Sequence, residues 1–407
     1  MQHAEAGTRH GLLLIAVAWL APIGSTLFAP VLPSIIAHFA AVPHAELLAP
    51  IAMVTPALMV ALLAPVAGLL TDRFGRRRVL LVALGLYAAT GIAPYWIDNL
   101  HLIIASRALV GIAEAGVMTA STALICDYFT GEKRAHWLSV QFGSASLVAT
   151  VCFALAGFLG GYNWRAPFII YGTMVVFIPL VLLIIFEPAR RSAHEGAAVI
   201  PADRAQGAFS SRFLIGLFMT LVSGILFCVT PVHISLVLSE RGFTAPTTLG
   251  LASAFGSIGL VAGAALFRFQ SKRPIGILLS AAMLTQSVGY VVLYTQPSLA
   301  GGILGMFINN AGCGISLPLV LAFTMGKLPD AFRGRASGLW TSAFFIGQFV
   351  CPLVVAGINA AAGGMVGVMG VLACFTAVAG FGLVGCLLAS VTMREAATPD
   401  GRSMIIH

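Results

Sequence analysis

Charged side chains are scarce in this chain. Of its 407 residues, 9% are Asp, Glu, Lys or Arg and 59% are hydrophobic, and the mean hydropathy is +0.98. A soluble protein of this composition would expose large apolar patches to water. The composition therefore excludes an ordinary soluble globule and predicts a protein embedded in a lipid bilayer.

Several motifs of catalysis and ligand binding are also missing from the sequence. The chain has no Gly-x-x-x-x-Gly-Lys loop of the kind that holds nucleotide phosphates, so we do not expect ATP to drive it directly. Its seven cysteines lie in apolar runs without metal-ligand spacing, which predicts small core residues rather than disulfides or a metal site. A membrane enzyme would need a cluster of polar residues such as His and Asp, and the sequence shows none. We therefore expect neither catalysis nor a cofactor.

Long apolar runs recur along nearly the whole chain. A hydrocarbon core of about 30 Å requires roughly 20 apolar residues in one helix. The runs are too long for barrel strands and do not alternate with period two, which favours helices. Twelve are predicted, near residues 11–37, 45–70, 79–97, 101–126, 135–160, 166–186, 212–236, 245–267, 274–294, 298–325, 336–360 and 365–392.

The net charge of +8 is a signal of topology rather than of nucleic-acid binding. Of the 22 Lys and Arg residues, only Arg107 lies well inside a run, and only Arg165 and Arg241 fall in loops of one parity. The other 19 lie in the two tails or in loops of the other parity. This bias predicts a multi-pass protein with both termini in the cytoplasm. Short loops favour a bacterial inner-membrane protein that works as a monomer.

A basic turn after the second run repeats later in the chain. The turn reads Gly68-Leu-Leu-Thr-Asp72-Arg73-Phe-Gly75-Arg76-Arg77-Arg78, and a shift of about 195 residues brings Gly263-Ala-Ala-Leu-Phe-Arg-Phe-Gln-Ser-Lys-Arg273 onto it. The acid and the second glycine are replaced, but most of the basic residues remain. Two related six-helix halves are typical of a transporter whose binding site lies at the midplane between them. We predict a first bundle at 1–186, a cytoplasmic linker at 187–211, a second bundle at 212–392 and a cytoplasmic tail at 393–407.

These features resemble the major facilitator superfamily along the whole chain. The stretches that carry the resemblance are the basic turn, Arg107-Ala-Leu-Val-Gly111 and Phe345-Ile-Gly347-Gln348-Phe. Ala29-Pro30-Val-Leu-Pro33 is most similar to the drug:proton antiporter branch, while Glu114-Ala-Gly and Cys126-Asp127-Tyr-Phe are also similar to spinster-type lipid transporters. The resemblance implies an all-α integral membrane fold of twelve helices in two pseudo-symmetric bundles.

Glu114 is the strongest candidate for a functional residue. Of fourteen acids it alone lies near the middle of a predicted helix, where a carboxylate costs several kcal/mol unless it is protonated, paired or hydrated. Burial favours its neutral form, so Glu114 is suited to take and release a proton. The alternative is a permanently protonated residue that bonds a neighbouring helix.

Arg107 lies seven residues before Glu114, about 10.5 Å along the same helical face. We therefore expect both side chains to face the central cavity without direct contact. The resemblance implies that Arg107 takes part in proton coupling, and a buried cation is also able to hold an anionic substrate.

The basic turn is predicted to belong to a cytoplasmic gate. The resemblance implies that its contacts lock the outward-facing state and break when the protein opens inward. Asp72 is able to cap the next helix or to pair with arginines of the loop between the tenth and eleventh runs, and Asp127 is placed to accept from Arg76. Pure topology anchoring is the alternative, but it explains the arginines and not the acid or the glycines. The predicted gate residues are Gly68, Asp72, Arg73, Gly75, Arg76 and Asp127.

Polar candidates in the second half are few. Asn309 and Asn310 lie in the middle of one predicted helix, and because neighbours on a helix point about 100° apart, one of them is expected to face the cavity. The pair has two alternative roles, contact with the substrate or hydrogen bonding between helices. His233 is a further candidate for the cavity, either as an interfacial histidine or as a proton relay.

The leading functional prediction is export of a small amphipathic or drug-like compound in exchange for protons. Competition between a proton and a cation for Glu114 would give such an exchange. The alternatives are transport of an organic anion or siderophore held by Arg107, and transport of a lipid. The direction of transport stays open at this stage.

Overall fold

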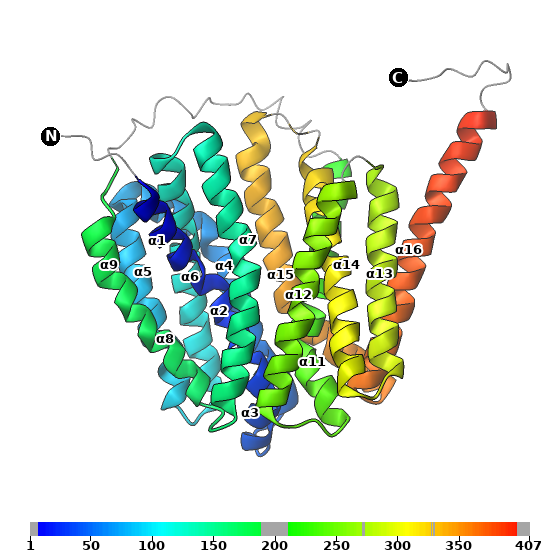
Figure 1. Ribbon diagram of the computed structural model, residues 1–407, viewed down its shortest axis with the longest axis horizontal. Helices are drawn as coiled ribbons and strands as arrows, with labels where there is room; N and C mark the ends of the chain where they lie inside the picture. The colour runs from blue at the N-terminus through cyan, green and yellow to red at the C-terminus, as the bar shows by residue number, and fades with distance from the viewer. Residues whose placement is uncertain (1–6, 189–210, 271–272, 327, 329, 397–407) are drawn as a thin grey trace.

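The computed structural model describes residues 7–188, 211–270, 273–326, 328 and 330–396, and within them all regular structure is helical (Figure 1). Twelve segments of this described part are long and apolar enough to cross a membrane. They match the twelve predicted runs in order and position, so the predicted fold class is confirmed. The predicted linker falls outside the described residues except at its ends.

The first half contains six spans, of which the first and the last are broken into short pieces. Pro22, Pro30 and Pro33 interrupt the first span because proline supplies no backbone N–H to a helix. The first span comprises α1 (Thr8–Ala18), α2 (Leu20–Thr26), η1 (Ala29–Val31) and α3 (Leu32–His38). The middle four are α4 (Ala45–Phe74), α5 (Arg76–Gly91) with η2 (Ala93–Tyr95), α6 (Leu100–Tyr128) and α7 (Gly131–Gly160). The sixth comprises η3 (Ala166–Phe168), α8 (Ile169–Thr173), η4 (Met174–Val176) and α9 (Phe177–Ile184).

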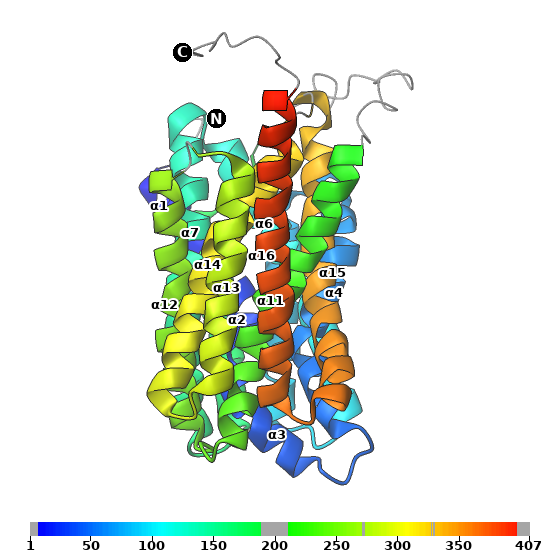
Figure 2. The same cartoon turned by 90° about the vertical axis from the view of Figure 1, so that its right-hand side faces the viewer.

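The second half contains six longer helices. They are α11 (Ser211–Glu240), α12 (Pro246–Gln270), α13 (Ile275–Thr295), α14 (Leu299–Met325), α15 (Asp330–Ala362) and α16 (Met365–Ala396). The last helix continues into the segment predicted as a tail. Figures 1 and 2 show the two halves side by side, with α4 packed against α15 and α7 against α12.

The start of α1 and the end of α16 lie at one face of the molecule, here called the terminal face (Figure 1). The two halves touch closely towards the opposite face, where α7 ends and α12 begins. A Cβ atom on Gly157 would lie 2.7 Å from the Cα atom of Gly250, so the two backbones are in contact. Nearby, the Ser235 hydroxyl donates to the carbonyl oxygen of Ala29 at 2.7 Å. This contact region between the halves is called the glycine seam below.

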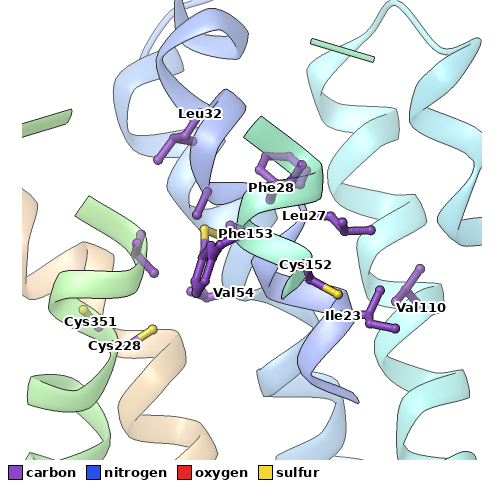
Figure 3. Packing of buried hydrophobic residues seen from close by; sticks show 14 of the residues in the cluster. Ile23, Leu27, Phe28, Leu32, Val54, Val110, Cys152, Phe153, Cys228 and Cys351 are labelled. Carbon is purple, nitrogen blue, oxygen red and sulfur yellow. The ribbon is translucent and has the colours of Figure 1, made fainter. Parts of the chain in front are cut away.

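Apolar side chains fill the space between the helices. Figure 3 shows part of one buried cluster, to which α2, α4, α6, α7, α11 and α15 contribute. Cys152, Cys228 and Cys351 belong to this cluster as free thiols, as the sequence predicts, whereas Cys374 is exposed. The interior is therefore a packed apolar core in which a buried polar side chain stands out.

An ionic cluster joins three segments of the first half at the opposite face. The Asp98 carboxylate accepts from Nε2 of His38 and from Nη2 of Arg165, each at 2.6 Å. Trp164 packs against both partners, with its ring 5.2 Å from that of His38 and 4.9 Å from the Arg165 guanidinium. The hydrogen bond from His38, and then the charge of Arg165, hold the pKa of Asp98 below its usual range.

We expect this cluster to make the stability of the protein sensitive to acid. A carboxyl group whose pKa is lower in the folded state stabilises that state above its unfolded pKa of about 3.9, and the contribution is lost as the pH falls through the lowered value. The melting temperature of purified wild-type protein should therefore drop more steeply between pH 5 and pH 3 than that of Asp98→Asn. Parallel melting curves for the two proteins would contradict this expectation.

Candidate functional site

Buried polar groups of the first half converge on the backbone of α2 at Gly24. The Phe28 N–H bonds to the carbonyl oxygen of Ser25 at 3.3 Å, so the turn leaves the Gly24 carbonyl free for other donors. Arg107 of α6 donates to this oxygen, and the Tyr171 hydroxyl donates to it at 2.8 Å. The other terminal nitrogen of Arg107 donates to the Tyr171 oxygen at 2.7 Å. Two segments, α6 and α8, are thereby tied to one point in the first span.

The structure differs from the expectation that Arg107 faces the central cavity. Its side chain is fully buried, and its guanidinium carbon lies 5.6 Å from the ring centre of Phe28 and 5.3 Å from that of Tyr171. The Gly24 carbonyl and the Tyr171 hydroxyl take up its donors inside the first half. Arg107 is therefore placed to shape α2 rather than to touch a substrate.

Glu114 lies on the cavity side of the same group. Its side chain is 5% exposed, and a Cβ atom on Gly24 would lie 3.1 Å from its Oε2 atom. The absence of a side chain at Gly24 gives the carboxyl group room to approach α2. As expected, Glu114 and Arg107 make no direct contact, since the described residues contain no ion pair within 4.0 Å between them. Glu114 reaches the cavity that Arg107 does not reach.

The central cavity has a volume of about 240 Å³ and lies between the two halves. Its walls are largely apolar, with Phe153 from α7 and Phe227 and Phe345 from the second half. Glu114 is the charged group among the described residues that line it. Its other polar lining residues are Ser25, Thr26, Ser146, Ser257, Asn310 and Gln348.

The two candidate asparagines of α14 face different surroundings. Asn310 lines the central cavity, and its Nδ2 atom donates to the carbonyl oxygen of Gly256 at 3.1 Å. Asn309 is fully buried away from the cavity, and its Nδ2 atom donates to the carbonyl oxygen of Gln286 at 3.3 Å. The Thr230 hydroxyl lies within 3.3 Å of both amide oxygens. Only Asn310 is placed to contact a molecule in the cavity.

His233 is not part of the central cavity, in contrast to the prediction. It lines a second cavity of about 500 Å³ nearer the opposite face. The reason is its position one residue beyond Val232, which borders the central cavity. One step along α11 turns the side chain by about 100° and moves it towards the opposite face.

The basic turn lies at the terminal face and makes the predicted contact with α6. Arg76 Nε lies 3.0 Å from Oδ2 of Asp127, and Arg76 Nη2 lies 3.4 Å from Oδ1 of Asp72. Arg73 lies over the ring of Phe74, and a Cβ atom at Gly68 would meet open space. Gly75 has a φ of +96°, a conformation that favours glycine.

Glu187 is a contact of the basic turn that sequence reasoning missed. Its two carboxylate oxygens accept from the backbone N–H groups of Arg76 and Arg77 at 2.7 and 2.9 Å, so Glu187 rather than Asp72 caps α5. Its carboxylate occupies the place where a Cβ atom on Gly75 would lie. The available signal was an acid directly after the sixth apolar run. Tyr171 gave no comparable signal, since tyrosine is ordinary in a span.

The described residues contain no group of three or more His, Cys, Asp or Glu that could hold a metal ion. The chemical resources of the central site are therefore one carboxyl group, a few amides and hydroxyls, and apolar walls. Such a site is able to bind a small apolar molecule, to neutralise one positive charge and to exchange a proton.

Comparisons with known proteins identify the family of the chain. The family model described as Major Facilitator Superfamily matches residues 14–352. The tetracycline resistance protein, class C, of Escherichia coli is 29% identical over 378 residues, which cover 86% of this chain and 89% of that protein. The multidrug efflux pump LfrA of Mycolicibacterium smegmatis is 24% identical over 73% of this chain and 69% of its own length.

The fold also matches solved structures. One is a bacterial homologue of the human lysosomal transporter spinster in an inward-facing and unoccupied conformation, with a TM-score of 0.73 and 17% identity over 92% of this chain and 88% of that chain. At this identity the likeness concerns the fold alone.

Proposed function

The chain belongs to the major facilitator superfamily, and from this premise we propose that it is a proton-coupled transporter exporting small amphipathic cations by alternating access. Membership makes it a multi-pass membrane transporter of small molecules and not an enzyme. The observation that carries the proposal is that, among the described residues, one carboxyl group lies in an otherwise uncharged and largely apolar cavity. The names of the tetracycline and multidrug relatives support export of drug-like compounds.

In the proposed cycle, a proton and the cation compete for Glu114. An apolar site favours the neutral carboxyl group when the cavity holds no cation. An incoming cation neutralises the carboxylate and releases the proton, and a proton arriving from the other side expels the cation. One carboxyl group corresponds to one proton exchanged for each monovalent cation.

Arg107 acts as a positioning residue in this proposal. By holding the Gly24 carbonyl, it fixes the part of α2 that Glu114 approaches. An organic anion would need a cationic group in the cavity, and the guanidinium is buried elsewhere. Transport of an anion is therefore the less favoured alternative.

We also propose that the terminal face is cytoplasmic and that the protein works as a monomer in the inner membrane. The distribution of Lys and Arg supports this orientation. On this assignment the glycine seam closes the external side, which supports an inward-facing state. Arg76, Asp127 and Glu187 then lie at the cytoplasmic side, where rearrangement of their contacts would accompany closure.

The proposal is tested with proteoliposomes that enclose a pH-sensitive dye. The compounds added are a lipophilic cation, a neutral amphiphile of similar size and a carboxylate. We expect proton movement with the cation and none with the carboxylate. A signal with the carboxylate alone would favour an organic-anion transporter, and the proposal would then be abandoned.

A further inference from the structure

We propose that the second cavity is an external binding site for the ammonium group of an amine, with His233 and Asn359 as its acceptors. The choice of a cationic ligand rests on the proposed function. The existence of the site rests on different residues from those of the central cavity.

The second cavity continues the central cavity along the same helices. On α4, Met53 borders the central cavity and Pro50 the second, and on α15 the corresponding residues are Gln348 and Pro352. Residues three or four apart on a helix differ in height by about 4.5–6 Å. The two cavities thus lie about one helical turn apart along these helices, so the second stands next in line for a compound that leaves the first towards the opposite face.

His233 lines this cavity and has an unused hydrogen-bond acceptor. Its side chain is 1% exposed, and Nδ1 lies 3.1 Å from the carbonyl oxygen of Val229. A carbonyl oxygen only accepts, so in the neutral ring Nδ1 carries the proton and Nε2 keeps its lone pair. Among the described residues, none makes a hydrogen bond to Nε2. An acceptor without a partner, on a residue that lines a cavity, favours a ligand that donates.

Two further residues with acceptor groups line the same cavity. The Asn359 oxygen is buried and has no hydrogen-bond partner among the described residues. Glu46 contributes an exposed carboxylate near the start of α4, and His44 lies beside it. An ammonium group, with up to three N–H donors and a positive charge, matches this set. The described His and acid side chains do not group into a metal site.

This assignment predicts discrimination between two kinds of cation. A primary amine is able to donate to His233 and Asn359, whereas tetraphenylphosphonium has no N–H donor. Both kinds of cation suit the apolar central cavity with its carboxyl group. The second cavity should therefore bind the amine and not tetraphenylphosphonium.

The test measures binding of dansylcadaverine, a fluorescent primary amine, to purified full-length Glu114→Gln protein. We expect saturable binding that His233→Leu and Asn359→Leu each weaken about tenfold, since each removes one hydrogen bond to a charged donor. His233→Gln keeps an acceptor and should bind more tightly than His233→Leu. Tetraphenylphosphonium should not displace the dye.

Ile36→Val serves as the matched control, because it trims the same cavity without removing an acceptor, and binding should change less than twofold. Thermal unfolding verifies the fold of each variant. Absence of saturable binding, binding unchanged in both leucine variants, or displacement by tetraphenylphosphonium would overturn the external site. This assay involves no proton movement, so failure of the proposed coupling is detected separately.

Discussion

Replacing Glu114 with Gln is expected to leave downhill movement of a cationic substrate intact while abolishing its accumulation against a gradient. Exchange depends on one group that binds either a proton or the cation. A neutral amide takes up no proton, so movement of the cation through the variant is no longer linked to movement of a proton. The cavity already contains an amide at Gln348, so the change is compatible with its polarity. The variant should therefore fold normally and should lose only the coupling of cation transport to the proton gradient.

The size of this effect follows from the proposed stoichiometry. For electroneutral exchange of one proton per cation, each unit of pH difference supports about a tenfold concentration gradient, since about 1.4 kcal/mol corresponds to a factor of ten. Wild-type proteoliposomes with a difference of one pH unit should approach that ratio. Glu114→Gln vesicles should stay near a ratio of one, as measured with a radiolabelled lipophilic cation.

Glu132→Gln provides the control, because this exposed acid at the start of α7 lines neither cavity. It should accumulate the cation as well as wild type does. If Glu114→Gln still reached a tenfold gradient, Glu114 would not be the proton carrier.

Gly250→Leu is expected to stop turnover by preventing closure at the glycine seam. A Cβ atom at this position would lie 2.5 Å from the Cα atom of Gly157 and 2.6 Å from the carbonyl oxygen of Phe153. Both contacts are with backbone, which cannot move aside as a flexible side chain does. Overpacking typically costs about 1–3 kcal/mol, and about 3 kcal/mol shifts a two-state equilibrium more than a hundredfold. The protein should accumulate in a state in which α7 and α12 separate at this face.

The shift is measurable with spin labels at Tyr162 and Thr244, which are exposed beside the ends of the two helices. The labels are attached to introduced cysteines in a background from which the native cysteines have been removed. Compared with the parent protein, Gly250→Leu should show a longer distance between the labels and at least tenfold slower transport.

Gly382→Leu is the comparison variant. It places the same side chain on α16, where a Cβ atom meets open space. Its label distance and transport rate should match those of the parent. A normal rate in Gly250→Leu would show that the seam does not need to close during the cycle.

The fold was largely predictable because it depends on features that repeat along the chain. Apolar runs determine where helices cross a bilayer, and the repeated basic turn reveals two halves. The contact between Arg76 and Asp127 was also predictable, since both residues lie where spans end on the same side. The positions of the spans and the side on which each one ends follow from the length and the order of the apolar runs.

The orientation of single side chains was less predictable. Helical spacing placed Arg107 and Glu114 on one face, but it could not show that a broken first span offers a backbone carbonyl to the arginine. Similarly, one residue along α11 decides whether His233 belongs to the first cavity or the second. These outcomes depend on tertiary packing rather than on a sequence pattern.

The central cavity divides its chemistry unequally between the halves. Its carboxyl group belongs to α6, whereas the described residues that α11, α12, α14 and α15 supply are apolar, hydroxyl, thiol or amide side chains. Mutations in the second half therefore reshape the cavity without altering its ionisable group. Under the proposed function, natural selection could broaden the range of exported compounds through that half while the proton-coupling group is inherited unchanged. In a library of substitutions at Phe227, Asn310 and Phe345, variants with an altered range of transported compounds should therefore be more frequent than variants that have lost proton coupling.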